Sequence, residues 1–93
     1  MMTEEKKAYL KAMGQRIKKL RTDKGWSQQE LADRCGFSGR SIINKLEVGR
    51  NDINQNKLRI LADALGVDVA DILYVNTDEE HIKKMNLLLE HLE

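Results

Sequence analysis

The sequence predicts an all-α protein that forms a single domain. Its 93 residues include no proline and little of the alternation typical of β-strands, whereas Leu, Lys, Glu, Ala and Gln are abundant. Apolar residues recur at spacings of three and four, and capping residues precede these stretches. With 41% hydrophobic residues, the chain can bury one core near the lower end of comfortable size. Five or six helices would account for its length.

The first helix is expected to begin after Thr3, which can cap it. Its buried stripe follows the helical repeat and comprises Leu10, Met13, Ile17 and Leu20. Gly14 lies within this pattern and costs a helix about 1 kcal/mol relative to alanine. We therefore predict a helical N-terminal extension over residues 1–12 and a main domain over residues 13–75. Gly25 ends the helix, and Trp26 turns back into the core.

Two short helices joined by a tight turn are expected between Ser27 and Gly49. Ser27 and Glu30 form a capping box for the first of them, and Gly36 ends it in a left-handed conformation. Its apolar face consists of Leu31, Ala32 and Cys35. Cys35 is expected to be buried as a small hydrophobic residue. It has no histidine near it in sequence, so it does not indicate a catalytic nucleophile.

The second helix of the pair is expected to take Ser38 as its cap and to bury Ile42 and Leu46. Its outward face then carries a dense set of hydrogen-bonding side chains, namely Arg40, Ser41 and Asn44. Gly49 ends this helix, and a polar loop follows it. The pair of helices is the segment that organises the rest of the chain.

Two further helices complete the domain. Asn54 can cap a helix that runs to Leu65 and ends at Gly66, and Asp68 can cap a short helix over residues 69–74. The inward positions of the longer helix are Leu58, Leu61, Ala62 and Leu65. This makes a compact unit of five helices.

Residues 76–93 predict a C-terminal amphipathic helix that begins with a capping box at Thr77 and Glu80. Its apolar stripe comprises Ile82, Met85, Leu88, Leu89 and Leu92. Two heptads rarely form a stable coiled coil alone, so this helix needs a surface to lie on. That surface is either the same domain or a second copy of the chain, and we favour dimerisation.

The net charge of +1 conceals an asymmetry along the chain. Residues 1–50 hold twelve Lys and Arg against six Asp and Glu, a charge of +6, whereas residues 51–93 hold four against nine, a charge of −5. A basic half suggests an anionic partner, of which nucleic acid is the commonest. Solvated lysine-rich helix faces would give the same pattern.

Several spaced blocks resemble the Cro/repressor type of helix-turn-helix protein, a family that includes phage repressors and small bacterial regulators. The blocks are MGQRIKKLR from Met13, KGWSQQELADRCGFS to Ser38, KLEVGR from Lys45 and LRILADALGV from Leu58. The resemblance implies a five-helix lambda-repressor-like domain that places the second helix of the pair in the DNA major groove. It also implies a transcription regulator. An enzyme is not expected, because the sequence lacks the residue groupings that catalysis would require.

The resemblance also implies roles for individual residues. The base-reading candidates are Arg40, Ser41, Asn44 and Lys45. The phosphate-contact candidates are Gln28, Gln29, Arg50 and Asn51, and Gln28 would also brace the recognition helix. Arg21 and Glu47 match a partly buried salt bridge between the first and third helices of the family. Removing one partner of such a pair would cost a few kcal/mol.

This sequence departs from the family's pattern by one extra residue between Gly36 and Glu47. If Ile42 and Leu46 both face inward, the helix lengthens to absorb it; if Ile43 and Leu46 do, the turn absorbs it. Either arrangement leaves Ser41 and Asn44 outward, whereas Arg40 and Lys45 exchange prominence.

The function expected from these features is a homodimeric repressor that reads a palindromic operator in double-stranded DNA. The alternative is an antitoxin-like or other protein-binding regulator with the same fold, since the acidic second half would suit a basic partner. No cofactor or metal site is expected, because His81 and His91 are poorly spaced for one. A single cysteine, with no signal peptide or apolar run of about 20 residues, indicates a cytoplasmic protein without a membrane span.

Overall fold

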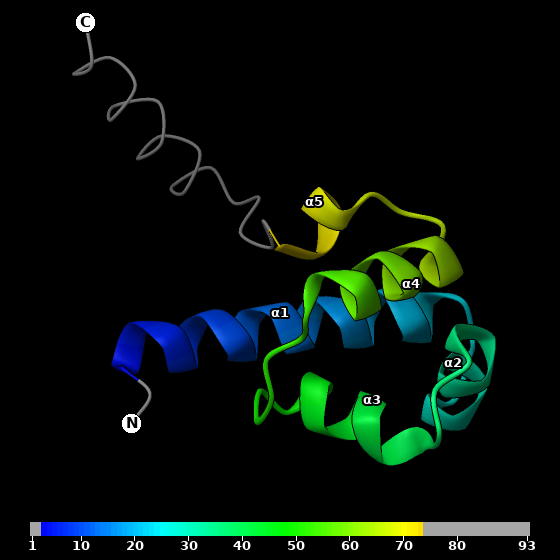
Figure 1. The fold of residues 1–93 in the computed structure, drawn as a ribbon, viewed down its shortest axis with the longest axis horizontal. Helices are drawn as coiled ribbons and strands as arrows, with labels where there is room; N and C mark the ends of the chain where they lie inside the picture. The colour runs from blue at the N-terminus through cyan, green and yellow to red at the C-terminus, as the bar shows by residue number, and fades with distance from the viewer. Residues whose placement is uncertain (1–2, 74–93) are drawn as a thin grey trace, which may run out of the picture.

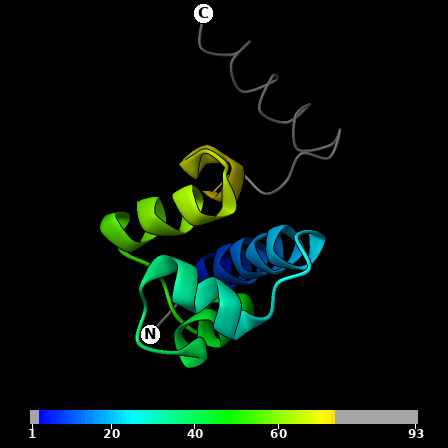
Figure 2. The same ribbon diagram turned by 90° about the vertical axis from the view of Figure 1, so that its right-hand side faces the viewer.

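The computed structural model describes residues 3–73 as five α-helices joined by turns (Figure 1). α1 (Glu4–Asp23) runs through the middle of the domain. α4 (Gln55–Leu65) and α5 (Val69–Leu73) lie on one side of α1, and α3 (Arg40–Glu47) lies on the other. α2 (Gln28–Cys35) closes one end, and Figure 2 shows the same layering from that end. The described residues contain no strand, which confirms the all-α prediction for this part of the chain.

Side chains cap three of the helices at the expected residues. The Thr3 hydroxyl accepts a hydrogen bond from the Lys6 amide, Ser27 accepts one from Glu30, and Asn54 accepts one from Lys57. α2 and α4 end at left-handed glycines, each with φ of 71°. At α5 the cap bond runs from the Asp68 amide to the Asp71 carboxylate, so the observed acceptor is Asp71 rather than the expected Asp68 side chain.

α1 is continuous across residues 12 and 13, where the sequence suggested a boundary. Leu10, in the expected extension, is only 1% exposed and belongs to the same core as Met13 and Ile17. Gly14 is present because α1 and α3 touch there: a Cβ on Gly14 would lie 2.2 Å from the Leu46 carbonyl oxygen. The glycine that weakens the helix therefore marks a packing contact between α1 and α3.

The core draws on all five helices. Its largest fully buried side chains are Leu10, Met13, Ile17, Leu31, Ile43, Leu61, Leu65 and Ile72. Trp26 packs against this core while half-buried, and the cations of Lys24 and Arg34 lie 5.2 and 4.0 Å from its ring centroid. The structural role expected for Trp26 is therefore observed.

α3 differs in its start and rotation from the helix expected to be capped by Ser38 and to bury Ile42 and Leu46. Gly39, not Ser38, is the N-cap, and no side chain caps this helix. Ile43 and Leu46 are the buried pair, at 0% and 2% exposure, whereas Ile42 is only partly buried. The extra residue therefore lies in the turn before α3, since α3 begins later than expected. With this start, Ile43 faces the core, and Glu47, four residues further on, faces the same way.

The expected C-terminal helix over residues 76–93 lies outside the described residues, as do Tyr74 and Val75. Its stripe of Ile82, Met85, Leu88, Leu89 and Leu92 is therefore untested. Between residues 3 and 73, no helix is both long and apolar enough to cross a membrane.

Candidate nucleic-acid interface

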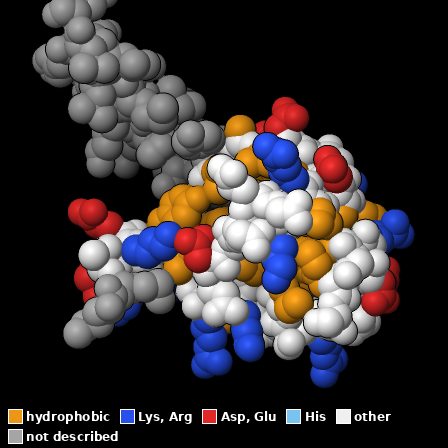
Figure 3. Space-filling view, viewed as in Figure 1, with side chains coloured by type: hydrophobic (Ala, Val, Ile, Leu, Met, Phe, Trp, Pro, Cys, Tyr) orange, Lys and Arg blue, Asp and Glu red, His pale blue; other side chains and the backbone are white. Residues whose placement is uncertain are grey.

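The outward face of α3 is polar and accessible. All the base-reading candidates on it are exposed, namely Arg40, Ser41, Asn44 and Lys45. Ile43, Leu46 and Glu47 fill the opposite face and are buried. Figure 3 shows Lys and Arg side chains projecting from the lower edge of the domain, where α3 and the following turn lie. One helix thus combines a buried, fixed face with a cationic, hydrogen-bonding surface.

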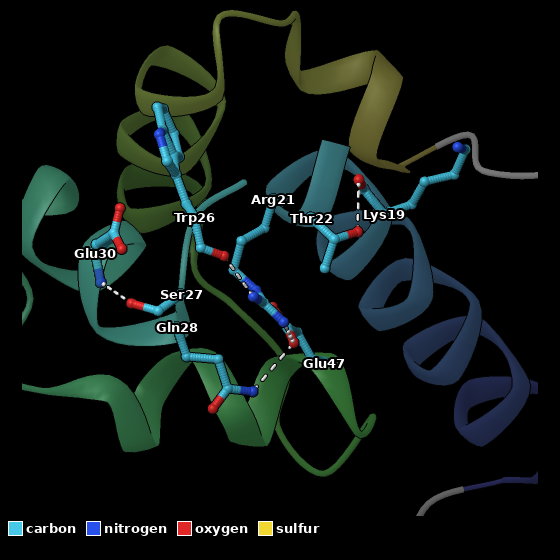
Figure 4. A network of polar contacts seen from close by, with 8 residues as sticks. All are labelled: Lys19, Arg21, Thr22, Trp26, Ser27, Gln28, Glu30 and Glu47. Atoms are coloured by element: carbon cyan, nitrogen blue, oxygen red, sulfur yellow. Dashed lines mark hydrogen bonds and ion pairs between the residues drawn. The ribbon is translucent and has the colours of Figure 1, made fainter. Parts of the chain in front are cut away.

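A buried ion pair joins α3 to α1 (Figure 4). Arg21 Nε donates to Glu47 Oε2 at 2.6 Å, and Arg21 Nη2 donates to Glu47 Oε1 at 3.0 Å. The side chains are only 10% and 2% exposed. The hydrogen bond and charge of Glu47 raise the already high pKa of Arg21, so the guanidinium stays charged. This two-pronged geometry resists rotation of either side chain.

Two further groups complete this network, one just before α2 and one at its first residue. The Trp26 carbonyl accepts from Arg21 Nη1 at 2.7 Å, and Gln28 Nε2 donates to Glu47 Oε1 at 3.1 Å. Gln28 therefore contacts α3, the helix that the resemblance implied it would brace. Gln29 does not join the network, because its amide donates to Asp33 within α2 at 2.8 Å. Among residues 3–73, every buried side-chain nitrogen and oxygen has a hydrogen-bond partner.

The loop after α3 carries the remaining phosphate-contact candidates. Arg50 and Asn51 are exposed, and the turn before them passes through Gly49, which has φ of 78°. Asp52, which the sequence analysis did not single out, is held by Lys6 from the first turns of α1 at 2.5 Å. Because these partners are 46 residues apart in sequence, no local pattern could have revealed the pair.

A shallow groove of about 140 Å³ separates α3 from this loop and the start of α4. Ile42, Leu46 and Ile53 supply its apolar lining, and Asn51, Asp52, Asn54 and Lys57 supply its polar rim. In the part of the chain that the structure describes, no three His, Cys, Asp or Glu side chains are grouped as metal ligands would be.

The model of the helix-turn-helix family matches residues 17–72, which include all of α2, α3 and α4. The chain belongs to this family. This family is the Cro/repressor type of DNA-binding helix-turn-helix protein. Its members are transcription regulators and not enzymes. The match ends at Ile72, so residues 76–93 lie beyond it.

Three relatives are similar to this chain over about two thirds to three quarters of its length. A prophage-derived regulator of Bacillus subtilis, YonR, is 40% identical over 60 residues, which is 64% of this chain and 55% of that protein. A Neisseria meningitidis hypothetical transcription factor is 37% identical over 70% of this chain and 58% of its own length. The regulator y4dJ of Sinorhizobium fredii is 38% identical over 74% of this chain and 87% of its own. The chain thus spans little more than half the length of the Bacillus and Neisseria relatives.

Solved structures of similar regulators have the same helical arrangement. The restriction-modification controller protein C.AhdI of Aeromonas hydrophila superposes with a TM-score of 0.69 at 33% identity, over 75% of this chain and 99% of that one. The clp gene regulator ClgR of Corynebacterium glutamicum gives 0.67 at 31% identity, over 72% and 85%. These likenesses confirm the lambda-repressor-like fold.

Proposed function

We propose that this protein is a cytoplasmic homodimeric repressor that reads a palindromic operator through the DNA major groove. The observation that carries the proposal is the two-sided character of α3. Its base-reading candidates are exposed on one face, while Ile43, Leu46 and the paired Glu47 fix the other. Such a helix can enter a groove without losing its own packing.

Affinity and discrimination come from different residues in this mechanism. Cations of the +6 segment, among them Arg50, release counterions from phosphates and attract DNA of any sequence. Arg40 can pair with guanine O6 and N7, and Asn44 with adenine N6 and N7. Each good bidentate contact is worth about 1 to 3 kcal/mol against the wrong base.

The dimer is proposed because one recognition helix reads too few base pairs to define a genomic site. Two copies would space their recognition helices by about 34 Å, one turn of DNA. An apolar groove of about 250 Å³ between α4 and α5 supports an interface on that side of the domain. It is lined by Leu58, Val69 and Leu73 with Gln55 and Arg59, and Leu73 is three residues before the segment 76–93 in the sequence.

Selection of bound sequences from a random duplex library tests the function directly. The full chain should enrich one sequence with two-fold symmetry, and the variant Arg40→Ala/Asn44→Ala should remain folded but lose that preference. Lys18→Ala/Asn56→Ala is the matched control, because it removes one cation and one amide from exposed positions on other helices. Failure of the parent to enrich any sequence would contradict the proposal and favour the protein-binding alternative.

A further inference from the structure

α1 contacts the end of α3 and the loop after it along most of its length. Arg21 binds Glu47, and Gly14 packs against the carbonyls of Leu46 and Glu47. About one turn nearer the N-terminus of α1 lies the next contact, where a Cβ on Gly49 would come within 2.9 Å of Lys11 Cα. Later residues of α3 and its loop therefore meet earlier residues of α1.

Lys6 and Asp52 form the last contact in this series. Lys6 Nζ lies 2.5 Å from Asp52 Oδ2 and 5.6 Å from the centroid of the Tyr9 ring. The other carboxylate oxygen of Asp52 accepts the Ile53 amide at 2.8 Å, which fixes the carboxylate to the loop. The hydrogen bond from Lys6 lowers the pKa of Asp52, and the same bond raises the pKa of Lys6. Both groups are therefore charged at neutral pH.

The position of Asp52 makes this pair important for an anionic ligand. Asp52 follows directly after Arg50 and Asn51, the loop residues assigned to phosphate. A carboxylate without its lysine would repel the same phosphate and compete for Arg50. We propose that Lys6 is a positioning residue for DNA binding, which holds and neutralises Asp52 so that the loop presents only cationic and amide groups. This assignment rests on the proposed function.

The pair can be tested with a mixed-sequence duplex at low salt, which probes phosphate contacts without requiring a known operator. The full chain is compared with Lys6→Ala, Asp52→Asn, and the double variant by fluorescence anisotropy. Lys7→Ala is the matched control, because it removes the same charge from the same turn but pairs with Glu4 inside α1. Asn retains an oxygen for the Ile53 amide, so the loop keeps that bond.

Lys6→Ala should weaken binding by about threefold to tenfold more than Lys7→Ala, the scale of one disturbed charge beside a phosphate. The double variant and Asp52→Asn should both bind within about twofold of the parent, since neither leaves an unpaired carboxylate. Equal effects of Lys6→Ala and Lys7→Ala would overturn the assignment. A double variant as weak as Lys6→Ala would also overturn it, because Lys6 would then act without Asp52. A parent that binds no duplex would instead overturn the proposed function.

Discussion

Gly14 of α1 and Leu46 of α3 approach so closely that a Cβ on Gly14 would lie 2.2 Å from the Leu46 carbonyl oxygen. The Glu47 carbonyl oxygen would lie 2.6 Å from the same atom. Both neighbours are backbone atoms, which cannot move aside as the end of a flexible side chain can. The close approach of α1 and α3 therefore requires glycine at position 14, because any other residue would bring a Cβ into this contact.

Gly14→Ala should destabilise the protein although alanine is the better helix former. The gain in helix propensity is about 1 kcal/mol, whereas forcing atoms into a filled contact costs typically about 1 to 3 kcal/mol and more when backbone must shift. We expect a net loss of about 2 kcal/mol in the free energy of unfolding, measured by urea denaturation. Gln15→Ala, at an exposed position of the same helix, should change stability little. A Gly14→Ala protein as stable as the parent would contradict the contact.

Breaking the Arg21–Glu47 pair from one side should be costly. Arg21→Met leaves a carboxylate that is 2% exposed and that retains, among residues 3–73, only the Gln28 amide as a partner. The expected loss is about 3 to 5 kcal/mol in the free energy of unfolding. Replacing both partners, as Arg21→Met/Glu47→Leu, should lose much less. Equal losses in the single and double variants would show that the charge left unpaired is not the cause.

DNA binding should depend steeply on salt. If about four phosphates are contacted, affinity should fall by about a hundredfold between 50 and 200 mM salt. Arg50→Ala should reduce the slope of log affinity against log salt by about one, as expected for one phosphate contact. A flat dependence for the parent would argue against a phosphate-led complex.

Cys35 should be unreactive in the native protein. Its side chain is 8% exposed, and burial raises the pKa of the thiol from 9.0 to about 11. Because the pKa is raised on folding, the stability linked to it is present below pH 9 and is lost as pH rises toward 11. A thiol reagent at pH 8 should label the protein slowly without urea and rapidly with it. Cys35→Ala should lose less stability between pH 9 and 11 than the parent.

Charged substitutions on the C-terminal stripe should separate the two copies of the proposed dimer. Met85→Lys/Leu89→Lys places two cations on the apolar positions and should give a monomer in sedimentation analysis. Asn86→Lys, off the stripe in the same segment, is the control and should remain dimeric. A dimer that survives the double substitution would move the interface elsewhere.

Local patterns in the sequence predicted most of the described helices correctly. The bounds of α4 follow from Asn54 and Gly66, because a cap and a left-handed glycine act within one turn of the helix end. The partnership of Arg21 and Glu47 came instead from the family resemblance, since 26 residues separate them.

The errors arose where distant packing decides the outcome. Ile42 and Ile43 are adjacent and equally apolar, so only the length of the preceding turn determines which one is buried. The close contact at Gly14 could not be predicted, because its neighbour, the Leu46 carbonyl, lies 32 residues away along the chain. No sequence pattern predicted the ion pair between Lys6 and Asp52, since both residue types are common on protein surfaces.

The division of α3 into a fixed side and an exposed side has an evolutionary consequence. Substitutions at Arg40, Ser41, Asn44 and Lys45 change no buried side chain, so they can accumulate without loss of the fold. Under the proposed function, a lineage that retains Ile43, Leu46 and Glu47 can acquire a new operator through a few such changes. Exchange of these exposed residues between relatives would then transfer one regulator's target to another.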